Sequence, residues 1–257
     1  MIEIKKLTKS YDSVRVLNSI SMSIKDGEIF TVMGPSGCGK STLLKCIIKL
    51  IVPEEGSIVI DGKDILKVKD EIELKLIRRD FGYLFQEGAL FDSLSVWENV
   101  AFGLKYLTDI PRERYFEIAR EKLNLVGLKD VEHKKISELS GGMKKRVALA
   151  RAIAHNPNYL LYDEPTTGLD PITAERIYDL IKETSEKLRV TSVVVTHDVR
   201  LALTVSSRIA ILNSGSLVMI DTPQGILDSA DPFVKEFIES PMIDWYQKQK
   251  VKYRYER

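Results

Sequence analysis

Residues 34–42 of this chain read Gly34-Pro35-Ser36-Gly37-Cys38-Gly39-Lys40-Ser41-Thr42. A glycine, four variable residues and then Gly-Lys-Ser form a pattern that is typical of loops that bind nucleotide phosphates. The glycines let the backbone curl so that several N–H groups point to one spot, and such a concavity binds anions. We therefore expect all residues of this loop to hold a nucleotide, with Lys40 on its terminal phosphates.

The segments on either side of the loop come in the order that the motif requires. Residues 29–33 are an apolar run, which predicts a short buried strand. Residues 41–48 have the apolar spacing of a helix, which we expect to begin at about Lys40. The N-terminus of such a helix adds positive potential at the place where the phosphates would lie.

Length and composition restrict the class of protein. The chain has 257 residues, of which 44% are hydrophobic and 29% charged, as in ordinary soluble proteins of one large domain or two lobes. A net charge of +1 creates no overall field for nucleic acid, so we expect no nucleic-acid partner. Cys38 and Cys46 are interpreted as free thiols of a reducing compartment. The N-terminal residues lack the apolar core of a signal peptide and no apolar run could span a bilayer, so we expect another chain to supply any membrane segment.

The order of the expected elements places the chain in the α/β class. Residues 2–24 are interpreted as β, and within them residues 19–24 alternate between serine and apolar side chains, as half-buried strands do. Further short strands are expected at residues 57–60, 81–85, 159–162 and 193–196. Residues 173–188 have helical spacing, and the resulting β-α-β order predicts a mainly parallel sheet. A turn at residues 213–215 predicts two final short strands.

Residues 87–155 differ in character from the rest and are interpreted as a helical insert. Helical spacing occurs there at residues 95–107, 112–126 and 142–155. Pro111 suits the first turn of the second of these helices. Near the end of the chain, residues 245–255 are basic and aromatic, which is compatible with a solvated terminus or with a docking segment.

Two carboxylates end the strand expected at residues 159–162. Asp163 offers a hard oxygen of the kind that Mg²⁺ prefers, beside the hydroxyl of Ser41. Glu164 follows one residue later and can point at a water instead of the metal, which suits a general base for hydrolysis. The alternative interpretation of this pair is a solvated strand end.

Ser140, Gly141 and Gly142 form a turn before a helical run. Serine and glycine are favoured at helix N-caps, so a simple cap is one interpretation. The other is a second anion site. One triphosphate rarely needs two cradles in one chain, and therefore the second cradle is expected to serve the opposite half of a dimer.

The phosphate loop, Leu139-Ser140-Gly141-Gly142-Met143 and Tyr159–Glu164, in this order, resemble the ATP-binding subunit of an ATP-binding-cassette (ABC) transporter over about residues 1–228. The resemblance implies a P-loop NTPase (RecA-like) core with an N-terminal antiparallel β subdomain, at 1–86 and 156–228. It implies a helical subdomain at about 87–155 and a C-terminal extension at 229–257. ATP and Mg²⁺ are the implied cofactors of a hydrolysing head-to-tail homodimer. Met143 departs from the family, because many members carry glutamine there.

The resemblance also implies roles for single residues. Tyr11 resembles the aromatic residue that stacks on adenine, and Gln86 resembles the glutamine that touches metal and water. Asp170 belongs to a loop that resembles the one meeting its twin across the dimer. His197 resembles the switch histidine that contacts the γ-phosphate. Residues 86–99 are then expected to form the groove for a coupling helix of a transmembrane permease.

A finer resemblance is to ATPases of Mla- and Mce-type phospholipid transport systems. It is carried by residues 85–91, by Met143 and by residues 170–173. It implies a permease, a lipid-binding Mce-type protein and small accessory subunits, with the ATPase at the cytoplasmic face of the inner membrane. It also implies that residues after about 232 reach over the neighbouring copy.

Alternative functions stay open at this point. One is an ABC ATPase for another substrate class, such as an amino acid, a metal or an exported molecule. Another is a non-transport ABC ATPase, such as the iron–sulfur assembly type. A GTP switch is disfavoured, because the chain contains no Asn-Lys-x-Asp sequence to read guanine.

Overall fold

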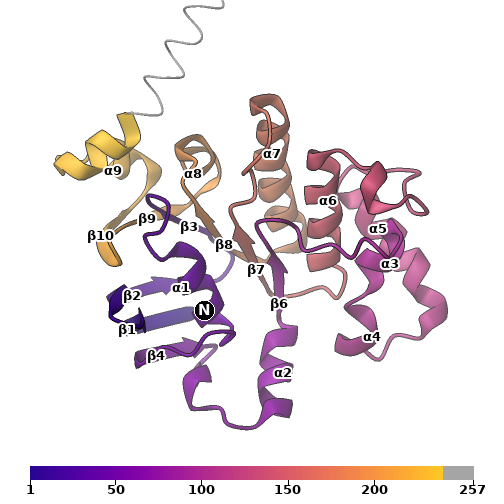
Figure 1. The fold of residues 1–257 in the computed structure, drawn as a ribbon, viewed down its shortest axis with the longest axis horizontal. Helices are drawn as coiled ribbons and strands as arrows, with labels where there is room; N and C mark the ends of the chain where they lie inside the picture. Colours follow the sequence, from indigo (N-terminus) through magenta and orange to yellow (C-terminus); the bar gives the residue numbers. More distant parts are fainter. Residues whose placement is uncertain (240–257) are drawn as a thin grey trace, which may run out of the picture.

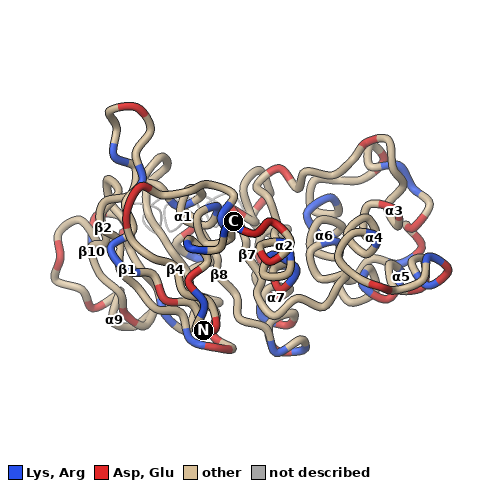
Figure 2. Tube along the Cα trace, turned by 90° about the horizontal axis from the view of Figure 1, so that it is seen from below, with Lys and Arg blue, Asp and Glu red and all other residues tan. Residues whose placement is uncertain are grey.

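The computed structural model describes residues 1–239 and consists of two sheets with helices around them (Figure 1). Residues 245–255, the expected solvated terminus or docking segment, lie outside the described residues. No described helix is both long and apolar enough to cross a membrane. Lys and Arg alternate with Asp and Glu along the trace in both halves of the described part (Figure 2).

The larger sheet has six strands in the order β10-β9-β3-β8-β7-β6. Its strands are β3 (Ile29–Met33), β6 (Phe81–Leu84), β7 (Tyr159–Asp163), β8 (Thr191–Thr196), β9 (Arg208–Asn213) and β10 (Ser216–Asp221). All neighbours are parallel except β9 and β10. Every residue of β3, β7 and β8 is buried, as expected for parallel strands covered on both faces. The predicted, mainly parallel sheet is confirmed.

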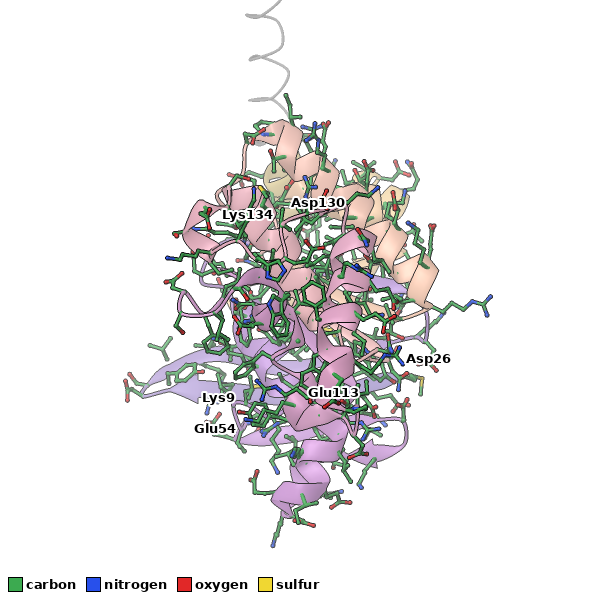
Figure 3. All side chains as sticks on the ribbon, turned by 90° about the vertical axis from the view of Figure 1, so that its right-hand side faces the viewer. Lys9, Asp26, Glu54, Glu113, Asp130 and Lys134 are labelled. Atoms are coloured by element: carbon green, nitrogen blue, oxygen red, sulfur yellow. The ribbon has the colours of Figure 1, made fainter. Side chains whose placement is uncertain are left out.

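The smaller sheet is antiparallel and has the order β2-β1-β4-β5. Its strands are β1 (Ile2–Tyr11), β2 (Val14–Ile24), β4 (Glu55–Ile60) and β5 (Lys63–Asp64). Lys9 on β1 forms an ion pair with Glu54, just before β4, with 2.6 Å between Nζ and Oε1 (Figure 3). An apolar cluster that includes Ile4, Leu44 and Val193 fills the space between the two sheets.

The helices of the insert lie together at one side of the molecule (Figure 1). They are α3 (Val96–Ala101), α4 (Leu104–Leu107), α5 (Tyr115–Leu125) and α6 (Gly141–Ala152). The single helix expected at 95–107 is in fact divided by a turn at Phe102 and Gly103, because glycine weakens a helix interior. A second apolar cluster, with Val100 and Leu160 among its members, joins these helices to the larger sheet.

The remaining helices pack around the larger sheet. They are α1 (Lys40–Ile47), α2 (Glu71–Arg79), α7 (Pro171–Leu188), α8 (Val199–Val205) and α9 (Pro223–Leu227). Of these, α2, α8 and α9 were not predicted. In α2, Leu74 is the one buried residue, while Ile72 and Leu76 are exposed, so this helix adds little to the core. Residues 232–239 are also helical, and Val234 and Ile238 pack in one cluster with Met33 of β3.

Candidate functional site

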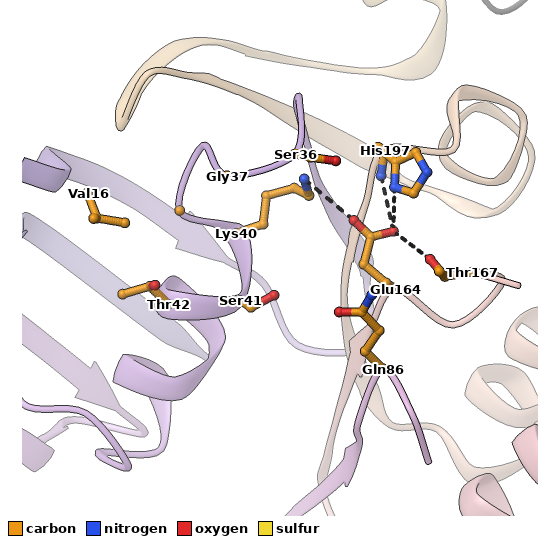
Figure 4. A pocket seen from close by; sticks show the side chains of 11 residues that line it. Val16, Ser36, Gly37, Lys40, Ser41, Thr42, Gln86, Glu164, Thr167 and His197 are labelled. Atoms are coloured by element: carbon orange, nitrogen blue, oxygen red, sulfur yellow. Dashed lines mark hydrogen bonds and ion pairs between the residues drawn. The ribbon is translucent and has the colours of Figure 1, made fainter. Parts of the chain in front are cut away.

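A cleft of about 380 Å³ opens where the carboxyl ends of the parallel strands meet (Figure 4). In open α/β sheets this edge is the usual place for a ligand. Its lining residues come from five separate parts of the chain: Val16, Ser36, Gly37, Gly39, Lys40, Ser41, Thr42, Gln86, Glu164, Thr167 and His197. The fold therefore brings the phosphate loop and the two residues expected to act on the γ-phosphate, Glu164 and His197, into one space.

Backbone geometry explains the glycines of the loop between β3 and α1. Gly39 has φ 104°, and a Cβ there would lie 2.5 Å from the carbonyl oxygen of Val16. Any other residue at this position would be strained and would also clash. Gly39 is the N-cap of α1, so the free N–H groups of the first helical turn face the cleft side of the loop.

Lys40 lies at the base of the cleft and is only 5% exposed. Its Nζ donates hydrogen bonds to the carbonyl oxygens of Gly34, at 2.8 Å, and Pro35, at 2.9 Å. The same ammonium lies 3.5 Å from Oε1 of Glu164 (Figure 4). These contacts hold a positive charge between the phosphate loop and the end of β7. Cys38 is buried behind the loop, and burial raises the pKa of its thiol.

Asp163 and Ser41 form the oxygen pair expected of a magnesium site. Ser41 Oγ donates to Asp163 Oδ1 at 2.6 Å, and the Tyr83 hydroxyl donates to Oδ2 at 3.1 Å. Burial, together with the nearby Asp163 charge, raises the pKa of Tyr83, so it remains a donor. Within residues 1–239 no group of three or more His, Cys, Asp or Glu side chains converges to hold a metal by itself. The chemistry fits a metal that takes most of its ligands from phosphate and water.

Glu164 occupies an unusual backbone conformation at the end of β7. Its φ is 48°, a left-handed value that costs a residue with a side chain roughly 1–3 kcal/mol. Its N–H donates to the carbonyl of Val195 at 2.9 Å, which holds this conformation. The side chain turns into the cleft, where its Oε2 lies 2.8 Å from His197 Nδ1 and 3.4 Å from Thr167 Oγ1 (Figure 4).

The contact between Glu164 and His197 changes the pKa of both groups. Burial alone would raise the pKa of Glu164, but the hydrogen bond and the charge of His197, with Lys40, hold this pKa below its ordinary value. The same hydrogen bond raises the pKa of His197 against the smaller effect of burial. The histidine contribution to stability is therefore complete below its unfolded pKa and is lost as the pH rises through the raised pKa. The glutamate contribution is present above the unfolded carboxyl pKa and is lost as the pH falls through the lowered one.

Replacing Glu164 with glutamine is expected to lower the pKa of His197 toward the ordinary histidine value, because the charged hydrogen-bond acceptor is removed. NMR titration of the histidine ring protons in the wild type and in Glu164→Gln measures this shift. An unchanged midpoint for His197 in the variant would show that the contact does not control its protonation.

The other expected site residues lie outside this cleft. Tyr11 is at the end of β1 with 44% of its surface exposed, while Val16 of the next strand lines the cleft. Ser140 caps α6 and its hydroxyl accepts a hydrogen bond from Met143 N at 3.3 Å. Asp170 caps α7, with Oδ1 accepting from the N–H groups of Ile172 and Thr173.

Gly141 and Gly142 form the first turn of α6 next to the start of α7. A Cβ on Gly142 would lie 2.5 Å from Thr173 Cγ2, so any other residue here would require the Thr173 side chain to shift. Gly141 is exposed and packs near Leu169. Ser140 and Gly141 are thus exposed at a helix N-terminus, with Gly142 buried behind them, and none of the three lines the cleft of the same chain.

Several residues around the site were not predicted. Val16 lines the cleft, Tyr83 binds Asp163, and Lys145 of α6 donates to the carbonyl of Gln86. Thr167 offered a signal, because it lies in the turn directly after Glu164. Tyr83 and Lys145 offered no signal, because only the pairing of β6 with β7 and the packing of α6 bring them near. Val16 offered none either, because it is the folding of β2 against Gly39 that places it at the cleft.

A sequence model of the family described as "ABC transporter" matches residues 17–167, which span the phosphate loop, Ser140 and the Asp163–Glu164 pair. The chain belongs to this ABC transporter family. The ABC chain is therefore an ATPase with a P-loop core, and it binds ATP. Cassettes of this family dimerise and pair with membrane permeases.

Named relatives match almost the whole ABC chain. A Mycobacterium leprae protein named "Probable ribonucleotide transport ATP-binding protein mkl" is 42% identical, over 94% of this chain and 70% of its own. The ATP-binding protein of an intermembrane phospholipid transport system from Haemophilus influenzae is 41% identical, over 93% of this chain and 90% of its own.

Solved structures confirm the fold class of the ABC chain. An ATP-binding cassette determined as a dimer in a post-hydrolysis state with ADP and Pi has a TM-score of 0.80 and 37% identity. The match covers 87% of this chain and 99% of that one. A cassette from Clostridium perfringens, part of a cbiONQ transporter complex, has a TM-score of 0.81, 28% identity and coverage of 96% and 98%.

Proposed function

We propose that this chain is the ATPase subunit of a phospholipid transport system, and that it powers a separate membrane permease. The observation that carries the proposal is the Haemophilus influenzae relative, because the match extends over 93% of this chain and 90% of that phospholipid transport ATPase. The short Mla- and Mce-like segments around Gln86, Met143 and Asp170 support the same substrate class.

The geometry of the cleft supports a role for each of its residues. Lys40 and the loop amides hold the β- and γ-phosphates of ATP, and the N-terminus of α1 adds positive potential. Glu164 accepts a proton from the attacking water, while His197 holds Glu164 and stabilises charge on the transferred phosphoryl group. Gln86 also lines the cleft, where it would orient the attacking water and contact the metal.

Mg²⁺ is proposed as the second cofactor. Ser41 and Asp163 would hold it together with the nucleotide, and Gln86 lies in the same cleft. When bound, the ion would neutralise charge that builds up between the β- and γ-phosphates. Tyr83 keeps Asp163 in its orientation from the neighbouring strand.

The second anion site is proposed to act on the twin subunit. Ser140, Gly141 and Gly142 lie outside the cleft of their own chain, and the exposed cap at Asp170 would lie at the same dimer interface. In a head-to-tail homodimer, each exposed helix start would complete the γ-phosphate site of the other copy. Tyr11 is proposed to stack on the adenine ring. It lies at the end of β1, which pairs with β2, and Val16 of β2 lines the cleft.

Domain limits and partners follow from the same proposal. The ATPase domain is proposed to cover residues 1–228, with the helical subdomain at about 87–155 and an extension at 229–257. We further propose a position on the cytoplasmic face of the inner membrane, with a permease, a lipid-binding Mce-type protein and small accessory subunits.

The permease is proposed to dock over residues 86–99 and the start of α4. Phe91 and Phe102 are each 40% exposed, although aromatic rings are usually covered. Their ring centroids are 4.5 Å apart, and Tyr106 lies 5.4 Å from Phe102. Such an exposed aromatic group suits an amphipathic coupling helix.

The substrate class is tested in the complex that this chain forms with its permease. We expect phospholipid to co-purify with the complex, and phospholipid to stimulate ATP hydrolysis more than ribonucleotide, spermidine or methionine at equal concentration. The complex with Glu164→Gln controls for contaminating ATPases. Stimulation by one of the other compounds alone would replace phospholipid as the substrate.

A second candidate function has specific support from other relatives. The Mycobacterium leprae protein is named for ribonucleotide transport, and a Carboxydothermus hydrogenoformans protein, 40% identical, is a methionine import ATP-binding protein. The stimulation assay distinguishes these substrates. Recovery of the chain without any membrane protein would favour a non-transport type, such as iron–sulfur assembly.

A further inference from the structure

Side chains of α6 hold the backbone of the turn that carries Gln86. β6 ends at Leu84, and residues 86–89 form a turn before the chain runs past α6 to α3 (Figure 1). The carbonyl oxygens of Gln86, Gly88 and Ala89 all accept hydrogen bonds from cationic side chains of α6. These contacts are made by the backbone of the turn and not by its side chains. The position of the turn therefore depends on α6.

Lys145 provides the first of these contacts. It is only 8% exposed, and its Nζ donates to the carbonyl of Gln86 and lies 3.5 Å from the carbonyl of Glu164. A buried ammonium is costly unless its donors are satisfied. The hydrogen bond to the Gln86 carbonyl therefore offsets part of the cost of burying the Lys145 ammonium. If this bond is lost, both the ammonium and the carbonyl lose a hydrogen-bond partner.

Arg151 provides two more contacts, with the carbonyls of Gly88 and Ala89 later in the same turn. Its Nη1 donates to Ala89 O at 2.7 Å and its Nη2 to Gly88 O at 2.6 Å. Gly88 and Ala89 both have left-handed backbones, with φ of 75° and 49°. Alanine is disfavoured in this region, so the contact with Arg151 helps to keep Ala89 there. The planar fork of arginine is suited to two neighbouring oxygens.

The far end of the same segment is also attached to the insert. Asn99 of α3 is completely buried, accepts from the N–H of Phe91 at 2.8 Å and donates to the Phe91 carbonyl at 3.0 Å. By contrast, the ring of Phe85 packs on Tyr83 of β6, with centroids 4.2 Å apart. The joint between the sheet and the insert therefore lies between Phe85 and Gln86.

We propose that Lys145 and Arg151 are positioning residues that fix residues 86–89 to α6 and thereby hold Gln86 at its place in the cleft. Ser140 caps the other end of the same helix, whose 12 residues span about 18 Å. One rigid helix would thus link the glutamine of its own ATP site to the serine offered to the twin. The inference rests on the proposed role of Gln86 in hydrolysis.

The test uses the full chain with three single variants, Lys145→Met, Lys145→Arg and Gln86→Ala, and the double variant Lys145→Met with Gln86→Ala. We expect Lys145→Met to lower kcat roughly ten-fold, on the scale of a lost charged hydrogen bond, with ATP affinity nearly unchanged. Lys145→Arg, which keeps a cationic donor, should restore most of kcat. The double variant should be no slower than Gln86→Ala alone, because Lys145 acts through Gln86.

Lys122→Met is the matched control. Lys122 is another buried lysine of the insert, and its Nζ donates to Asn156 Oδ1 at 2.7 Å rather than to the turn. It tests whether any buried cation of this region lowers kcat when removed. Equal loss in Lys122→Met and Lys145→Met would overturn the proposal, as would full additivity in the double variant.

Hydrogen exchange at the amides of residues 86–90 gives a readout that does not depend on hydrolysis. Faster exchange there in Lys145→Met, but not in Lys122→Met, is expected if the contacts hold the turn. If Lys145→Met does not accumulate as folded protein, Arg151→Lys, which can serve one carbonyl instead of two, is measured in the same way. Unchanged exchange in the folded variant overturns the inference. Full activity in Gln86→Ala would instead overturn the proposed role of Gln86 and leave the exchange result to decide on the contacts.

Discussion

The Glu164→Gln variant is expected to hydrolyse ATP roughly 10²- to 10⁴-fold more slowly than the wild type, which is the usual contribution of a general base. Glutamine has the same shape but cannot accept the proton of the attacking water. In the wild type the lowered pKa of Glu164 keeps its carboxylate ionised at neutral pH, so this loss is not masked by protonation. Steady-state hydrolysis in the complex measures it.

ATP binding should survive this change, because Lys40 and the loop amides hold the phosphates. The ATP-bound dimer should therefore persist longer than in the wild type, which size-exclusion chromatography with ATP detects. Glu113→Gln is the matched control, since Glu113 lies on the exposed surface of the insert (Figure 3). Wild-type turnover in Glu164→Gln would remove Glu164 from the role of base.

Two inactive variants should restore activity when they are mixed. Lys40→Met removes the ammonium that lies between Gly34 O, Pro35 O and Glu164. Ser140→Glu places a negative charge at the helix start that, in the proposed head-to-tail dimer, would face the γ-phosphate of the twin subunit. Each variant alone should lose at least about 10²-fold in hydrolysis, as losses of single transition-state contacts do.

In a mixed dimer one site combines the intact loop of the Ser140 variant with the intact Ser140 of the Lys40 variant. The second site carries both defects. An equal mixture that re-pairs at random should then regain roughly a quarter of the wild-type rate, if the two sites act independently. Ser140→Ala removes the hydroxyl without adding a charge. It therefore distinguishes charge repulsion between the introduced carboxylate and the γ-phosphate from loss of the proposed Ser140 contact. Full hydrolysis by Ser140→Glu alone would contradict the head-to-tail arrangement.

The parts of the fold that were predicted correctly depend on local patterns. The β3 run, the start of α1 at Lys40 and the β-α-β order of residues 159–196 were all visible as apolar spacing beside glycine or polar ends. The unpredicted helices are short, with nine residues in α2, seven in α8 and five in α9, so each offers few turns of apolar spacing.

The cleft was predicted as a set of residues, but its contacts were not. Glu164 was expected to activate water, while its 2.8 Å contact with His197 and its left-handed backbone appear only in the folded chain. Likewise, Tyr83 binds Asp163 because β6 and β7 are neighbours in the sheet, and the two residues are 80 positions apart. Separations of this length have no signature in a local pattern.

The residue types alone predicted a nucleotide site, because a glycine loop, a helix start and strand-end carboxylates each need specific residues at fixed local spacing. The residue types also predicted a second helix start, at Ser140, that is distinct from the phosphate loop. The tertiary structure alone decided which groups hold the catalytic residues in place, above all the cations of α6 on the turn of Gln86. The reason is physical: a side chain can donate to any carbonyl within reach, and only strand order and helix packing determine which carbonyl that is.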